Sequence, residues 1–118
     1  MDALSELDVW RRSKDLAVSV YKNLSGCADR GFRDQVTRSA VSIPSNIAEG
    51  YERASRKEFA RFLLIAKGSC AELRTQIQIG REIGYFNREI ADGMLQEAFA
   101  ITKMMQGLIK RCKSTSNN

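Results

Sequence analysis

Residues 38–69, RSAVSIPSNIAEGYERASRKEFARFLLIAKGS, decide the fold of this chain. Apolar residues recur in this stretch every three or four positions, which is the spacing of one face of an α-helix. Ser55 followed by Glu58 has the spacing of a capping box, in which the serine side chain accepts a hydrogen bond from an amide in the first turn. A helix is therefore expected to begin at Ser55.

The helix before this cap carries one core stripe with steps of four and three. The stripe consists of Val36, Ala40, Ile43, Ile47 and Tyr51. Pro44 lies in its middle, where it removes an amide donor and presses its ring against the carbonyl of Ala40. The helix is expected to kink or to restart near Ser42 to Ser45, and the unbroken phase of the stripe favours a kink.

Three further segments show helical periodicity. The first spans Val9 to Cys27, is apolar over a wide arc that includes Trp10 and Tyr21, and is followed by turn residues before the pattern resumes at Phe32. The segment from Ser55 ends at Gly84 as a left-handed cap, with the seam Phe59, Leu63, Ala66, Cys70, Leu73, Ile77 and Gly80. The last begins at Asn87 as N-cap, with the stripe Ala91, Met94, Ala98, Ile101, Met105, Leu108 and Cys112.

Four long amphipathic helices joined by three short connections predict an all-α fold, an antiparallel up-down-up-down four-helix bundle. A chain of 118 residues is the size of one domain. Residues 1–113 are assigned to this single bundle domain. Residues 114–118 are too polar to pack and are expected to form a disordered tail.

The residues that the chain lacks narrow its chemistry. There is no histidine, which excludes Ser-His-Asp and Cys-His nucleophile arrangements and the common histidine-containing metal sites. Three widely spaced cysteines indicate neither a disulfide framework nor a zinc site, and they fit a reducing cytoplasm. An acidic N-terminus and the lack of a long apolar run predict a chain that is neither exported nor membrane-spanning. No metal, cofactor or catalytic residue is assigned, and the chain is expected not to be an enzyme.

The third and fourth helices carry more apolar residues than one core requires. The surplus comprises Phe62, Ile65, Ile79, Ile83, Leu95, Phe99 and Ile109. Since contiguous apolar patches are seldom left open to water, self-association into a closed ring or a dimer would cover them. The alternative is that a four-helix core needs a broad stripe and that scattered exposed apolar residues are normal. Gly68, Ser69 and Gly80 are weak helix formers in the third helix, which fits either close approach of another helix or tolerated surface sequence.

A polar stripe lies beside the core stripe of the second helix. It contains Arg38, Ser42, Ser45, Glu49 and Arg53, with Asn46 between the two stripes. Either Asn46 and Glu49 form a hydrogen-bonded network that fixes the register of two helices, or this is a solvated face. An active site here is the third option.

Positive charge is concentrated in the second half of the chain. Residues 1–54 balance to zero, so the net charge of +5 comes from residues 55–118. Arg53, Arg56, Lys57 and Arg61 crowd the start of the third helix, where the helix dipole disfavours cations and a bound phosphate would offset that cost. Lys110, Arg111 and Lys113 lie near the end of the fourth helix, where cations are ordinary. A solvated, solubilising face is the alternative for both clusters.

SIPSNIAEG, KEFARFLLIAKGSCAEL and IGYF closely resemble segments of the four-helix-bundle proteins encoded within intervening sequences of 23S ribosomal RNA genes. The likeness runs from about Val9 to Lys110, and relatives include the accessory variability protein of diversity-generating retroelements. The resemblance implies a bacterial, homopentameric barrel of antiparallel bundles and no known catalytic residue. Pro44, Asn46, Glu49 and Gly50 match the signature and are interpreted as structural.

Two functional hypotheses follow. The first is a cytoplasmic, non-enzymatic homo-oligomer that binds RNA or DNA through phosphates, using Arg53, Arg56, Lys57, Arg61, Lys110, Arg111 and Lys113. The second is a protein-interaction scaffold, or an accessory subunit for a nucleic-acid-associated enzyme such as a reverse transcriptase. A small-molecule binder or enzyme that uses a pore or a cleft between subunits is a third reading.

Overall fold

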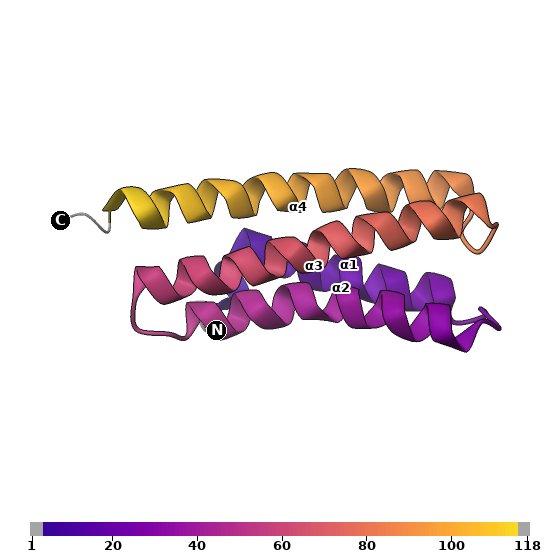
Figure 1. Cartoon of the computed structure of the whole chain (residues 1–118), viewed down its shortest axis with the longest axis horizontal. Coiled ribbons are helices and arrows are strands. Elements are labelled where there is room, and N and C mark those ends of the chain that lie inside the picture. The colour runs from indigo at the N-terminus through magenta and orange to yellow at the C-terminus, as the bar shows by residue number, and fades with distance from the viewer. Residues whose placement is uncertain (1–3, 116–118) are drawn as a thin grey trace.

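Four helices pack side by side along one common direction in the computed structural model, which describes residues 4–115 (Figure 1). A short 3-10 helix precedes them, and no strand occurs within the described residues. The elements are η1 (Leu4–Glu6), α1 (Asp8–Leu24), α2 (Arg30–Tyr51), α3 (Arg56–Glu82) and α4 (Arg88–Thr115). The all-α bundle expected from the sequence is confirmed. α4 continues through Ser114 and Thr115, whereas the remainder of the expected polar tail, residues 116–118, lies outside the described residues.

Side-chain caps fix where three of the helices begin. The Ser55 hydroxyl accepts the amide of Glu58 at 3.1 Å, and the Asn87 side-chain oxygen caps α4, so both expected caps are confirmed. Asp29 caps α2 by accepting the amide of Phe32 at 3.1 Å. Each cap satisfies an amide that the first turn of a helix leaves without a carbonyl partner.

The end of α3 is a Schellman motif centred on Gly84, whose φ of +87° favours glycine. The amide of Tyr85 donates to the carbonyl of Gly80 at 2.8 Å, and that of Gly84 donates to the carbonyl of Arg81 at 3.3 Å. The chain turns directly from this motif into the cap of α4. The left-handed cap expected at Gly84 is therefore confirmed.

The core lies between the four helices and follows the expected stripes. Its fully buried residues include Val20, Leu24, Val36, Ile43, Ile47, Leu63, Cys70, Leu73, Ile77, Ile101 and Met105. Tyr21 is a correction, because 52% of this residue is exposed and it lies at the edge of α1 beside α2. Phe62 and Ile109 are corrections in the other direction: both belong to the buried interior and not to a second apolar face.

Pro44 is accommodated inside one continuous helix. α2 runs unbroken from Arg30 to Tyr51, so the expected alternative of a restart near Ser42 to Ser45 is wrong. The proline ring is buried beside the core stripe. Its burial compensates for the hydrogen bond that its missing amide cannot make.

The polar stripe of α2 divides into two parts. Asn46 donates to the Ser42 carbonyl at 2.8 Å and to the Ser42 hydroxyl at 3.0 Å, and that hydroxyl lies 2.9 Å from the hydroxyl of Ser69 on α3. These bonds form a network between α2 and α3, which is one of the two alternatives that the sequence left open. Glu49 takes no part in it, because it is exposed and pairs with Arg53 at 2.9 Å.

Candidate nucleic-acid interface

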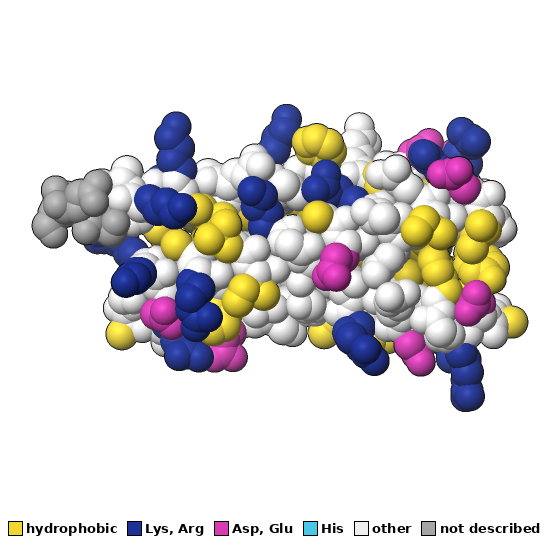
Figure 2. Space-filling view, viewed as in Figure 1, with side chains coloured by type: hydrophobic (Ala, Val, Ile, Leu, Met, Phe, Trp, Pro, Cys, Tyr) yellow, Lys and Arg dark blue, Asp and Glu magenta, His cyan; other side chains and the backbone are white. Residues whose placement is uncertain are grey.

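The two basic clusters found in the sequence lie at the same end of the bundle. The start of α3 and the end of α4 meet there (Figure 1), and Arg56 and Arg111 are both close enough to Cys112 to act on its thiol. Burial raises the pKa of Cys112, and the two guanidinium groups oppose that rise. Figure 2 shows Lys and Arg side chains gathered over this end, with some Asp and Glu among them. The basic end is defined here as Arg53, Arg56, Lys57, Arg61, Lys110, Arg111 and Lys113.

Phe62 organises two of these cations. The guanidinium carbons of Arg53 and Arg61 lie 5.0 Å and 4.5 Å from the centroid of its ring, within the range of a cation–π contact. Phe62 is itself buried, so the ring is a fixed platform for both side chains. Sequence reasoning placed Phe62 on a self-association surface and missed this role. The i, i+1 spacing from Arg61 gave no signal for it, because such neighbours do not face each other on an ideal helix.

Glu58 neutralises part of the cluster. Its two carboxylate oxygens accept from Nε and Nη2 of Arg61, both at 3.1 Å, and Arg53 lies 4.0 Å away. Hydrogen bonding from Arg61 lowers the pKa of Glu58, with smaller contributions from the nearby positive charges. The carboxylate therefore stays ionised at neutral pH and is poorly suited to act as a general base.

The charge balance of this end is positive. Among the described residues, Glu49, Glu52 and Glu58 are the acids beside the start of α3, and Glu6 in η1 and Asp8 at the start of α1 line a hollow with Arg111. Lys57 and Lys110 are exposed. The seven bases of the basic end outnumber these five acids. The arrangement supplies permanent cations and hydrogen-bond donors, which is the chemistry that phosphate recognition requires.

Basic side chains continue along the α3–α4 side of the molecule. Arg74 and Lys103 lie 5.4 Å and 5.5 Å from the ring centroid of Phe99. Half of Phe99 is exposed. Sequence reasoning did not include Arg74 or Lys103 in the basic surface, because the periodicity of a single helix does not show what its neighbour brings alongside.

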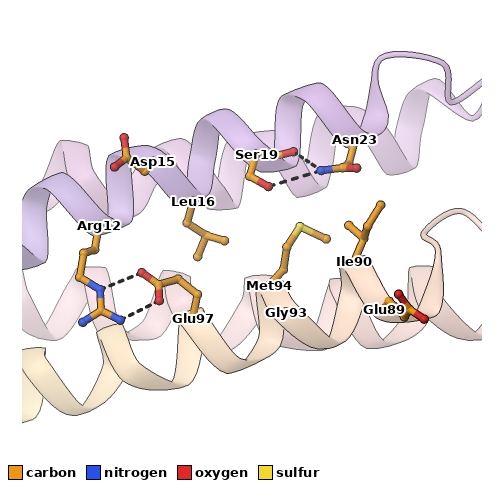
Figure 3. A pocket seen from close by; sticks show the side chains of 10 residues that line it. All are labelled: Arg12, Asp15, Leu16, Ser19, Asn23, Glu89, Ile90, Gly93, Met94 and Glu97. Carbon is orange, nitrogen blue, oxygen red and sulfur yellow. Dashed lines mark hydrogen bonds and ion pairs between the residues drawn. The ribbon is translucent and has the colours of Figure 1, made fainter.

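A groove between α1 and α4 is a further hollow with polar chemistry (Figure 3). Arg12 donates from Nε and Nη2 to the two oxygens of Glu97, at 2.8 Å and 2.7 Å. Hydrogen bonding lowers the pKa of Glu97 and raises that of Arg12. Leu16 and Met94 form an apolar floor in a cavity of about 440 Å³. The contact joins residues 85 positions apart, so the sequence gave no sign of it.

Among residues 4–115, no three side chains of the types that bind metals gather in one place. No helix in the described part of the chain combines the length and apolar character needed to cross a membrane.

Comparison with known proteins places the chain in a family. A crystal structure of a protein of unknown function from the S23 ribosomal protein family of Bacteroides thetaiotaomicron VPI-5482 superposes with a TM-score of 0.81 and 27% sequence identity. That similarity covers 86% of this chain and 98% of the Bacteroides chain. No curated protein matches the sequence. The profile of the 23S rRNA-intervening sequence proteins matches residues 5–107, and the chain belongs to that family.

Proposed function

We propose that this protein is a non-enzymatic bundle that self-associates and binds RNA or DNA through backbone phosphates that meet its basic end. One observation carries the proposal: two basic clusters about 50 positions apart in the sequence share one end of the fold. Binding through phosphates would not depend on base sequence.

Self-association would strengthen this surface. The pentamer of antiparallel bundles implied by the family resemblance would gather five basic ends, so a modest charge on each copy would produce a strong positive field. The hydrophobic residues left exposed along α3 support self-association. All three cysteines are free, which fits the reducing cytoplasm in which such a complex would act.

Charge reversal tests the proposal. We expect the double variant Arg56→Glu with Lys57→Glu to lose retention of labelled single- and double-stranded RNA and DNA in a low-salt filter-binding assay. The matched control is Lys22→Glu with Arg30→Glu, which changes the net charge equally at exposed positions outside the basic end. This control should lose much less affinity.

Two outcomes would contradict nucleic-acid binding. One is the absence of retention by the unmodified protein, and the other is equal loss in both double variants, which would indicate a general charge effect. If one stoichiometric protein copurified after nuclease treatment and required the same residues, the basic end would instead be the surface for a protein partner. An accessory subunit of a nucleic-acid-associated enzyme, such as a reverse transcriptase, would then be the better description.

A further inference from the structure

The solvent side of α3 carries large exposed apolar side chains toward both of its ends. Leu64, Ile65, Ile79 and Ile83 are between 43% and 54% exposed. Figure 2 shows hydrophobic side chains exposed toward both ends of the bundle on this side of the molecule. This surface is called the α3 outer face, and it contains Leu64, Ile65, Gly68, Ala71, Glu72, Thr75, Ile79 and Ile83. A helix that is apolar both toward the core and toward solvent is typically covered on both sides.

Small residues form a hollow in the middle of the α3 outer face. Gly68 and Ala71 lie in a depression of about 270 Å³ that Leu64, Lys67 and Arg74 border. A Cβ added at Gly68 would meet no atom within 4 Å. Packing inside the bundle therefore does not require glycine here, whereas a large side chain from outside would find room.

Large apolar side chains are exposed on a different side of the bundle. Val18 and Tyr21 on α1 and Val41 on α2 are 44%, 52% and 39% exposed, and together they form the α1–α2 patch. Tyr21 and Val41 line one shallow hollow together with Arg38. The patch therefore offers the large side chains that the hollow of the α3 outer face can accept.

The two surfaces also carry opposite charges at matching heights. Arg38 beside the α1–α2 patch and Glu72 on the α3 outer face are both exposed, and neither has an ion-pair partner among residues 4–115. The hydrogen bond between Ser42 and Ser69 shows that these two residues lie at the same level of the bundle. α2 and α3 run in opposite directions, because a turn at one end of the bundle joins them (Figure 1). Residues that precede Ser42 in α2 and residues that follow Ser69 in α3 therefore lie toward the same end of the bundle. Arg38 and Glu72, about one turn away in each case, are therefore also level with each other.

We infer that the α3 outer face of one copy packs against the α1–α2 patch of a second copy, with Tyr21 and Val41 over Gly68 and with Arg38 facing Glu72. Two different surfaces meet in this contact, so it is heterologous and leads to a ring or an open chain of copies. The inference rests on the self-association in the proposed function and adds the surfaces that mediate it.

Gly68→Leu separates assembly from folding. Leucine fills the hollow and favours the helix more than glycine does, so the single copy should remain folded. In sedimentation velocity at micromolar concentration, we expect the unmodified protein to be an oligomer and Gly68→Leu to associate at least tenfold more weakly. Gly107→Leu is the matched control, since a Cβ at Gly107 also meets nothing within 4 Å and lies on another surface. It should assemble as the unmodified protein does.

Charge reversal and mixing test the pairing of surfaces. Arg38→Glu and Glu72→Arg should each weaken assembly, and the two together should restore it. Val41→Glu damages only the α1–α2 patch, and Gly68→Leu damages only the α3 outer face. In an equimolar mixture, the intact α3 outer face of the Val41→Glu variant can bind the intact α1–α2 patch of the Gly68→Leu variant. The mixture should therefore form a one-to-one dimer with a single contact.

Other results would overturn the inference in distinguishable ways. An oligomeric protein whose Gly68→Leu variant stays assembled, or whose Val41→Glu variant does so, would contradict these surfaces but leave self-association standing. A protein that is monomeric throughout would contradict self-association in the proposed function and with it this contact. Nucleic-acid retention by the monomer would show that the basic end acts without assembly.

Discussion

Two glycines lie where neighbouring aromatic side chains leave no room for a Cβ atom. A Cβ at Gly50 would lie 2.5 Å from the Cβ of Phe62, and one at Gly80 would lie 2.6 Å from the ring of Phe86. The close approach expected at Gly80 is therefore real, although aromatic rings and not a helix backbone fill the space. At Gly68, by contrast, no described atom comes within 4 Å of where a Cβ would lie. Sequence reasoning identified Gly50 only as part of a family motif, because the contact requires knowing that α2 ends against the start of α3.

Gly50→Ala should destabilise the bundle, since the new methyl group meets Phe62 near its backbone and that ring cannot move without disturbing Arg53 and Arg61. Overpacking typically costs about 1–3 kcal/mol, and alanine recovers up to about 1 kcal/mol in helix propensity. We expect a net loss of about 1–2 kcal/mol in urea unfolding. The control Gly107→Ala has open space and should be neutral or stabilising. Equal stability of Gly50→Ala and the unmodified protein would refute this account of the glycine.

At the scale of helices, amphipathic periodicity was enough to predict the four elements and most of the core. Capping chemistry at Ser55, Gly84 and Asn87 is local, so those boundaries could be predicted from sequence. The particular polar contacts between α1 and α4 could not be predicted. Arg12 on α1 donates to Glu97 and lies 3.5 Å from the sulfur of Met104, both on α4 and far from Arg12 in the sequence.

Glu97→Gln should lower stability at neutral pH but not in acid. Arg12 lowers the pKa of Glu97, so the folded protein binds that proton less tightly than the unfolded chain. The stabilisation is present above the ordinary glutamate pKa of about 4.3 and is lost as the pH falls through the lowered value. The side chains are about a third to two fifths exposed, which limits the effect to about 1 kcal/mol at most.

Urea unfolding at pH 7 and near pH 3 measures this difference. The two proteins should differ at pH 7 and converge in acid. Glu89→Gln, in the same groove but without an ion pair among the described residues, should match the unmodified protein at both pH values. A Glu97→Gln deficit that persisted unchanged in acid would show that the ionised pair is not its source.

At the scale of the whole molecule, the fold creates a surface that no single helix carries. Residues near positions 53–61 and 110–113 come together because α3 and α4 run the length of the bundle and meet at one end (Figure 1). The sequence predicted both clusters but could not show which acids accompany them. Glu58 and the start of α1 reduce the net charge, and Phe62 holds two of the guanidinium groups in place.

The salt dependence of RNA and DNA binding tests the central claim most directly. On double-stranded DNA, each phosphate neutralised contributes about −0.9 to the slope of log affinity against log salt concentration. We predict a slope of several units for the unmodified protein, similar affinity for unrelated sequences, and a clearly shallower slope for Arg56→Glu with Lys57→Glu. Binding that is absent at low salt, or that persists unchanged as salt rises, would contradict phosphate recognition by the basic end.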